Sequence, residues 1–329
     1  MKRIISVSRR TDIPAFYGDW FMGRLKDGFA VVVNPFGGQR NFVSLKPEDI
    51  VCFVFWSKNF RPFLENLKII DSLGYKFYFN YTVTGLPPVF ESNVEGSRGA
   101  GSPKQVAIET LKQLSKTYSS RHINWRFDPI IISSICDCDF YIRVFEELAS
   151  QFAGFVERCY FSFVAEYNKV KRNFEELEKS TSVKIFQTSK DIKIELGNEF
   201  AAIAERYGIQ MFSCCGNYLV NDRIKKAHCI DGAIIEELFF PKGLQYNEKP
   251  TRKECGCTES TDIGAYDTCP HGCVYCYANA NKRRAYKAFG NHDKESAFLG
   301  YSQSDSDRWL AEETRTFLPQ SSQSLLRFS

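Results

Sequence analysis

The sequence has no apolar run long enough to cross a membrane, since no segment approaches the ~20 apolar residues that a bilayer span requires. The first residues reach Arg9, Arg10 and Asp12 after one short apolar stretch, so we expect no signal peptide and a cytoplasmic protein with reduced thiols. No internal repeat is present, and no Lys/Arg run extends beyond residues 282–284. The net charge of +4 therefore permits nucleic-acid binding without indicating it.

What the chain does contain is cysteine, with twelve in 329 residues. In a reducing compartment such cysteines serve as small buried apolar residues or as metal ligands rather than as disulfides. The hydrophobic content of 43% and the charged content of 25% are ordinary for a globular protein. The length suits one (β/α) barrel of roughly 250 residues with additions.

Short apolar runs alternate with helical patterns along the chain, which is typical of βαβ units and a parallel sheet. We expect strands at residues 4–7, 30–33, 51–55, 76–82, 123–127, 158–164, 209–212 and 258–263. About eight strands are enough for a complete or nearly complete α/β barrel of the TIM type. An incomplete six-stranded barrel is the main alternative.

The same patterns predict how the chain is divided. Residues 1–254 are expected to form the (β/α) barrel, and residues 255–290 a cysteine-rich loop and a following helix, 277–289, that complete it. Residues 291–329 are a polar, serine-rich tail with a short helix at 309–317. Residues 85–103, rich in Gly, Pro and Ser, follow a strand and are predicted to form a lid.

Cys269, Cys273 and Cys276 form a C-x3-C-x2-C motif. Cysteine thiolates are the usual ligands of iron–sulfur clusters, and a cluster held by only three of them has one open iron. Structural zinc, with Cys257 or His271 as the fourth ligand, is the alternative, although zinc sites usually contain paired C-x2-C units. The spacing therefore favours an iron–sulfur cluster with three protein thiolates over zinc.

With Tyr275 before its last cysteine and the continuation Tyr-Cys-Tyr-Ala-Asn at 275–279, the motif resembles that of the radical S-adenosylmethionine (SAM) enzymes, especially the spore photoproduct lyase branch. The resemblance implies that the three cysteines hold a [4Fe–4S] cluster and that its open iron chelates SAM. It also implies that reduced flavodoxin or ferredoxin supplies an electron. It implies an enzyme that cleaves SAM reductively and abstracts hydrogen from a substrate. A nucleic-acid lesion, a nucleotide, a peptide and a metabolite are all open as that substrate.

Other segments are similar to a bacterial family, domain of unknown function 1848. The segments that carry this similarity are residues 8–14, 125–129, 255–257 and 262–266. The cysteine motif lies near the end of the chain, whereas in most radical SAM enzymes it follows the first strand. We therefore expect a circularly permuted barrel of the TIM or partial-TIM radical SAM type, in which the first strand neighbours the last.

Polar side chains follow several predicted strands, at the edge where (β/α) barrels build their active sites. The candidate catalytic residues are Arg10, Asp12, Arg126 and Asp128, and the candidate cofactor-binding residues are Tyr275, Asn80 and Glu166. For the pairs Arg10–Asp12 and Arg126–Asp128, a structural ion pair is the alternative interpretation.

Four further cysteines form a candidate second metal site: Cys215, Cys229, Cys255 and Cys257. A second [4Fe–4S] cluster and a zinc ion both take four such ligands, so spacing does not separate them. Inert thiols are the alternative. For the whole protein, the alternative to a radical SAM enzyme is a non-catalytic zinc or iron–sulfur binding module that acts in redox sensing or nucleic-acid binding.

Overall fold

The longest strands of this protein are apolar on both faces, which is typical of a parallel sheet covered on each side. In β4 (Ile50–Ser57), Phe53 and Phe55 pack in one hydrophobic cluster, whereas Cys52 and Val54, which point the opposite way, pack in a second. Because successive side chains alternate between the faces, a run of apolar residues requires a core on both sides of the sheet.

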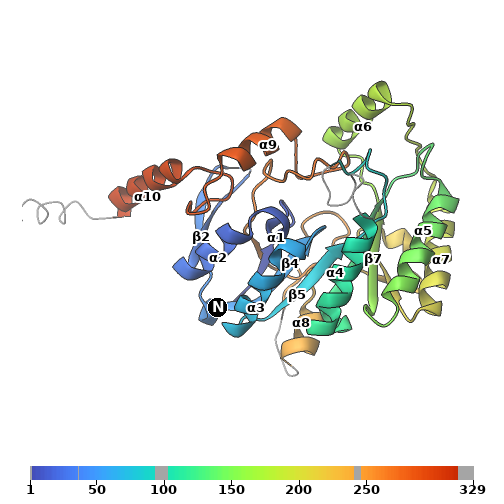
Figure 1. Ribbon diagram of the computed structural model, residues 1–329, viewed down its shortest axis with the longest axis horizontal. Coiled ribbons are helices and arrows are strands. Elements are labelled where there is room, and N and C mark those ends of the chain that lie inside the picture. The colour runs from blue at the N-terminus through green and yellow to red at the C-terminus, as the bar shows by residue number, and fades with distance from the viewer. Residues whose placement is uncertain (1, 36, 93–102, 241–245, 318–329) are drawn as a thin grey trace, which may run out of the picture.

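The structure is a computed structural model and describes residues 2–35, 37–92, 103–240 and 246–317. An eight-stranded parallel sheet forms its centre, in the order β10-β1-β4-β5-β6-β7-β8-β9 (Figure 1). Besides β4, its strands are β1 (Arg3–Val7), β5 (Phe77–Thr82), β6 (Ile123–Ile130), β7 (Arg158–Phe163), β8 (Gln210–Ser213), β9 (Ile224–Lys226) and β10 (Thr261–Asp262).

Helices lie between the strands and after the last of them. The α-helices are α1 (Ile13–Phe16), α2 (Gly18–Asp27), α3 (Leu64–Ser72), α4 (Pro103–Thr117), α5 (Cys138–Phe152), α6 (Asn168–Ser180), α7 (Lys190–Arg206), α8 (Gly232–Phe239), α9 (Lys282–Asn291) and α10 (Gln303–Phe317). Short 3₁₀ turns occur at Pro47–Asp49, Arg61–Phe63, Ser120–His122 and Asn217–Leu219. No helix in the described ranges has the length and apolar character that a bilayer crossing requires.

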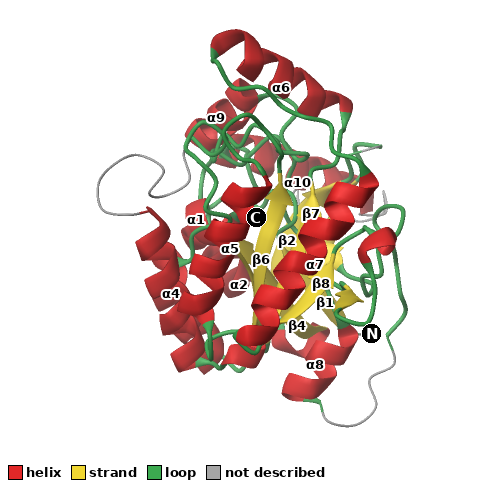
Figure 2. Ribbon diagram, turned by 90° about the vertical axis from the view of Figure 1, so that its right-hand side faces the viewer, coloured by secondary structure: helices red, strands yellow, loops and turns green. Residues whose placement is uncertain are grey.

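The two faces of the sheet are covered differently. Helices α4, α5 and α7 pack side by side over one face (Figure 2), where Leu111, Phe145 and Phe200 belong to the larger hydrophobic cluster. The opposite face carries α8, whose Ile234 and Ile235 pack in the second cluster together with five cysteines that are described below. We call this second side the inner face.

The parallel α/β architecture is confirmed, but the sheet is not a closed barrel. In the part of the chain that the structure describes, β9 and β10 are the two edges and no pairing joins them. The two edge strands are only three and two residues long, which leaves little backbone to form the pairing that would close a barrel. The prediction that the first strand neighbours the last is confirmed, because Ile5 of β1 pairs with Thr261 of β10.

The strand expected at residues 30–33 exists but lies outside the main sheet. It is β2 (Phe29–Val33), which pairs in antiparallel fashion with β3 (Arg40–Ser44). Its apolar run predicted a strand correctly, but such a run says nothing about which partner the strand finds. β9, only three residues long, was not predicted from its charged sequence, Ile-Lys-Lys.

The C-terminal segments differ from the expectation in their boundaries. The helix after the cysteine motif begins at Lys282 rather than 277, because the Asn281 side chain caps it by accepting a hydrogen bond from the Arg284 N–H at 3.2 Å. The tail helix α10 is longer than expected and buries Trp309 against Phe298. The rest of the predicted tail, residues 318–329, lies outside the described residues.

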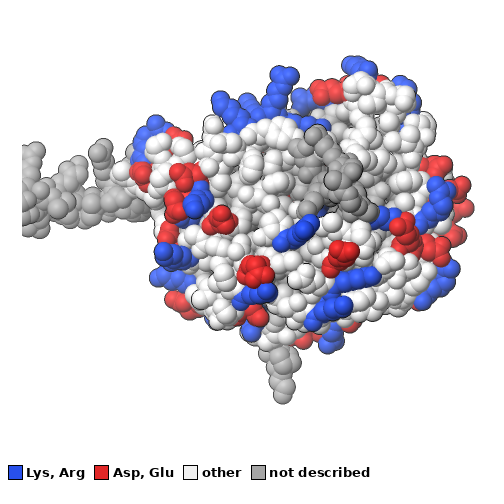
Figure 3. Space-filling view, viewed as in Figure 1, with Lys and Arg blue, Asp and Glu red and all other residues white. Residues whose placement is uncertain are grey.

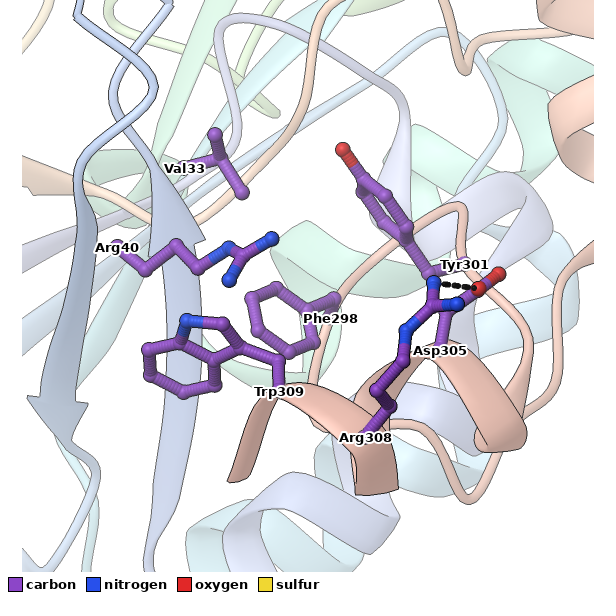
Figure 4. A pocket seen from close by; sticks show the side chains of 7 residues that line it. All are labelled: Val33, Arg40, Phe298, Tyr301, Asp305, Arg308 and Trp309. Carbon is purple, nitrogen blue, oxygen red and sulfur yellow. Dashed lines mark hydrogen bonds and ion pairs between the residues drawn. The ribbon is translucent and has the colours of Figure 1, made fainter. Parts of the chain in front are cut away.

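A pocket of about 160 Å³ separates the β2–β3 ribbon from α10 (Figure 4). Its lining residues are Val33, Arg40, Phe298, Tyr301, Asp305, Arg308 and Trp309. The Arg40 guanidinium lies 5.2 Å from the centre of the Trp309 ring, and Arg308 pairs with Asp305 at 2.9 Å. None of the predicted site residues lines this pocket, so the pocket is separate from the predicted site.

Burial of Tyr78 on the inner face predicts a loss of stability at high pH. Burial, and secondarily the nearby Cys52, raise the pKa of Tyr78 well above its usual 10.0. The unfolded chain therefore releases this proton near pH 10 while the folded chain keeps it, so stability falls as the pH rises. We expect Tyr78→Phe to reduce the slope of unfolding free energy against pH, above pH 10, by up to about 1.4 kcal/mol per pH unit.

Urea denaturation at pH 7, 10 and 11 measures this slope for both proteins. The values at pH 7, where tyrosine is neutral in both states, separate the cost of the lost hydroxyl contacts from the proton linkage. Equal slopes in the two proteins would contradict the prediction.

Candidate metal centre

The cysteine motif lies at the carboxyl edge of the sheet, because β10 ends at Asp262 and the motif follows it. The Asp262 carboxylate accepts hydrogen bonds from the hydroxyls of Ser6 and Ser8 at 2.7 and 2.6 Å and from the Arg9 N–H at 2.7 Å. These bonds join the loop after β10 to the loop after β1. The N-terminal and C-terminal segments thus build one site.

The three motif cysteines lie close enough to influence one another. Burial raises the pKa of Cys269 and Cys276, and raises that of Cys273 to about 12. Cys276 contributes to the increase at both other thiols, as one negative charge does when it disfavours another nearby. The three thiols of the predicted main site therefore lie near one another, Cys273 buried and the other two half-buried.

Backbone contacts close the cysteine loop on itself. Asn279 donates its side-chain N–H to the Cys269 carbonyl at 2.6 Å, and its backbone N–H lies 3.4 Å from the Cys276 sulfur. Gly272 has a φ of +72°, a conformation that residues with a side chain adopt at a cost, so the turn between the first two cysteines requires glycine.

Three lysines surround these thiols. Burial raises the pKa of Cys276, while the positive charges of Lys169 and Lys58 act to lower it. Lys58 also acts to lower the pKa of Cys273. Lys282, at the start of α9, interacts with both sulfurs. Positive charges at such positions favour thiolates over thiols, which is the form that binds metals.

Tyr275 and Lys58 meet at one buried carboxylate that was not predicted from the sequence. Oε1 of Glu91 accepts hydrogen bonds from the Lys58 ammonium at 2.7 Å, from the Thr84 hydroxyl at 3.2 Å and from the Tyr275 hydroxyl. Burial acts to lower the pKa of Lys58, but Glu91 outweighs it and the pKa is raised. Glu91 thus holds the cysteine loop against the loop after β5.

Glu91 was not predicted as a site residue, because it lies in the Gly-, Pro- and Ser-rich segment that was interpreted as a lid. Within that segment, residues 93–102 lie outside the described residues. The described part contacts the cysteine loop directly, since the Val274 N–H donates to the Phe90 carbonyl at 3.0 Å.

Asp12 lies at this site but pairs with a different residue than expected. Its Oδ2 accepts the Lys58 backbone N–H at 2.8 Å and lies 2.7 Å from Nε2 of His271, while Oδ1 caps α1. Arg10 instead lies 3.9 Å from Asp262 and 5.2 Å from the Tyr266 ring. Asp12 therefore positions His271 and the loop after β4.

The pair Arg126–Asp128, by contrast, is an ion pair, as the alternative interpretation had it. Both side chains point to the inner face, where Ser162 also donates to Asp128. Arg126 further donates to the Cys229 sulfur at 2.9 Å, and Asn80 donates to the Cys229 carbonyl at 2.9 Å. Two residues predicted for catalysis or cofactor binding thus contact the second group of cysteines.

Glu166 stands apart from both groups. It follows β7 at the same edge of the sheet but is exposed and pairs with Lys171 at 3.2 Å. None of its contacts that the structure describes involves a cysteine.

The second group of cysteines is assembled as predicted and gains one member. Cys214 joins the four expected cysteines, its sulfur 3.4 Å from that of Cys229, and Arg252 donates to Cys215 at 2.9 Å. The adjacent Cys-Cys pair in the sequence was a signal for Cys214, whereas nothing in the sequence pointed to Arg252. All twelve cysteines are free. Among the described residues, no three His, Cys, Asp or Glu side chains are already arranged around a common metal position.

Comparison with known proteins places the chain in a family without assigning it an activity. No curated protein and no solved structure matches it. A family model described as "Domain of unknown function (DUF1848)" matches residues 4–278, which include both groups of cysteines and every strand of the main sheet except the first residue of β1. The chain therefore belongs to the DUF1848 family.

Proposed function

We propose that this chain is a radical SAM enzyme in which Cys269, Cys273 and Cys276 hold a [4Fe–4S] cluster with one open iron. The observation that carries the proposal is the placement of three interacting thiols, one buried and two half-buried, on one loop at the carboxyl edge of a parallel sheet. That edge is where α/β proteins bind their ligands and cofactors.

The surroundings of the thiols fit such a group. Four buried polar atoms on the two loops that meet there have no hydrogen-bond partner among the described residues: Arg9 Nη1, Thr11 Oγ1, His271 Nδ1 and Asn279 Oδ1. Buried polar atoms are normally paired, so an unpaired set next to three thiols fits a site for a polar cofactor. The guanidinium of Arg9 suits the carboxylate of SAM, and Nδ1 of His271 suits a cluster sulfide.

The open sheet supports a partial barrel of the radical SAM type. In that interpretation the strand–cysteine loop–helix unit, here β10, the motif and α9, stands at the end of the chain instead of the beginning. Because β10 lies beside β1, moving the unit to the N-terminus leaves its neighbours in the sheet unchanged. A circular permutation therefore accounts for the late position of the motif.

Cys269, Cys273 and Cys276 would hold the cluster, which, when reduced by flavodoxin or ferredoxin, would supply reductive cleavage of SAM and abstraction of hydrogen from the substrate. The chain's own residues bind, orient and exclude water. Glu91 fixes Tyr275 and Lys58 beside the thiols, and Asp12 fixes His271. Burial of this network keeps water from the thiols, which protects reactive species.

The substrate belongs to one of the classes implied by the resemblance, and the surface favours an anionic one. Lys and Arg side chains gather at the top of the molecule, over α9 (Figure 3). That helix contributes Lys282, Arg283, Arg284 and Lys287. A basic surface next to the cluster loop attracts phosphates, so a nucleotide or a nucleic-acid lesion is the substrate class we favour.

Anaerobic reconstitution with iron and sulfide, followed by electron paramagnetic resonance of the reduced protein, tests the proposal. We expect a [4Fe–4S] signal that changes on addition of SAM, because SAM would bind the open iron. A reconstituted cluster whose electron paramagnetic resonance signal does not change when SAM is added would overturn the enzyme assignment. A colourless protein with zinc on the motif would favour the non-catalytic binding module instead.

A further inference from the structure

Five cysteines on the inner face form a closed ring of sulfur contacts. In order around the ring they are Cys214, Cys229, Cys257, Cys255 and Cys215, the last of which contacts Cys214 again. The sulfurs of Cys214 and Cys229 are 3.4 Å apart, and the five residues are buried or half-buried. So many free thiols in mutual contact are unusual in a core, where cysteines pack singly as small apolar residues.

The ring is assembled from three segments, each held in place by its own contacts. Cys214 and Cys215 follow β8, Cys229 follows β9, and Cys255 and Cys257 precede β10. The segments are also locked together: a β-carbon on Gly256 would lie 2.7 Å from the ring of His228, so only glycine permits this close approach. The fold thus directs the sulfurs toward one another.

Two arginines donate hydrogen bonds to sulfurs of the ring. Arg126 donates to Cys229 at 2.9 Å, and Arg252 donates to Cys215 at 2.9 Å and approaches Cys214 at 3.5 Å. Positive charges at such positions favour the thiolate form of cysteine, which is the form that binds metals.

The sulfur–sulfur distance measured in the ring, 3.4 Å between Cys214 and Cys229, indicates a single ion. In a tetrahedral zinc tetrathiolate with Zn–S bonds of about 2.3 Å, neighbouring sulfurs are about 3.8 Å apart. The observed 3.4 Å is close to that edge. In a four-iron cluster each cysteine binds a different iron, so the ligating sulfurs are necessarily further apart. The geometry therefore matches a mononuclear site better than a second cluster.

We infer that four of these five cysteines, Cys214 and Cys229 among them, bind one zinc ion. Binding draws the four sulfurs from pairwise contact to a common centre. The ion would link the segments after β8 and β9 to the segment before β10, and so bridge the open side of the sheet. This structural role is separate from the proposed catalytic cluster.

The test uses the full chain with Cys269, Cys273 and Cys276 all replaced by alanine, which removes the main site. We expect this variant, purified without added metal, to contain about one zinc per chain and no iron. X-ray absorption at the zinc edge should give four sulfur ligands at about 2.3 Å. Adding Cys255→Ser and Cys257→Ser should abolish zinc binding, whereas adding Cys138→Ser, at the start of α5, should not.

Iron and sulfide in the triple variant would overturn the inference, as would the absence of any metal or zinc with nitrogen or oxygen ligands. The absorption spectrum needs only the triple variant, so it decides the matter even where the serine variants fail to fold. Failure of the catalytic proposal gives a different result, namely loss of the SAM effect in the unmodified protein while this zinc remains.

Discussion

Replacing Cys273 by alanine is expected to reduce the iron content of the reconstituted protein from about four atoms per chain to background. Cys273 is the central cysteine of the motif, is only 7% exposed, and interacts with Lys58 and with the thiol of Cys276. A cluster with one open iron already has the minimum of protein ligands, so loss of one thiolate leaves two, too few to retain it. SAM cleavage, measured as 5′-deoxyadenosine, should be lost with the iron.

A matched control comes from Cys159, which is fully buried in β7 and packs on the helix-covered face of the sheet. Cys159→Ala should retain full iron content, although its stability falls because a small cavity is created. Zinc at the second site should be unchanged in both variants. Full iron content in Cys273→Ala would rule out the assignment of the motif as the main cluster site.

The second large effect is expected at Asp262. Asp262→Ala should lower the free energy of unfolding by about 3–5 kcal/mol, the usual cost of removing one partner from a buried charged network. Its carboxylate, 6% exposed, accepts hydrogen bonds from Ser6, Ser8, Arg9 and the Gly264 N–H, and pairs with the two arginines after β1. Alanine leaves these donors without a partner.

The effect is large because so little else holds β10 in place. β10 pairs with β1 over two residues, and the cysteine loop follows it directly. Urea denaturation measures the loss. Asp305→Ala, which breaks an exposed ion pair with Arg308, should cost no more than about 1 kcal/mol and serves as the control. A loss at Asp262 as small as that of the control would contradict the prediction.

Much of the architecture could be predicted from local pattern alone. Apolar runs such as Phe53–Phe55 correspond to observed strands. Closure of the barrel could not be predicted in this way, because it depends on whether the two edge strands, β9 and β10, meet. The apolar pattern of α8 is that of any buried helix, and only packing reveals that it covers the second face of the sheet.

The candidate site was likewise predictable from the sequence only in part. Cysteine spacing identified the motif and four members of the second group, since ligands of one site often lie close together in the chain. Glu91 and Asp262 hold the cysteine loop, yet each contacts partners far away in the sequence: Glu91 bonds Tyr275 and Asp262 bonds Ser6. Spacing carries no information about such contacts.

By itself, then, the sequence determined which residues can bind metal, since thiolate chemistry depends on residue type and local spacing. It also determined the parallel α/β class, because alternation and helical period are properties of short segments. The tertiary structure decided which residues surround the thiols: Asp12 with His271, Lys58 with Glu91, and Arg126 and Arg252 with the second group. The reason is that parallel strands bring their carboxyl ends to a single edge, so residues hundreds of positions apart become neighbours there.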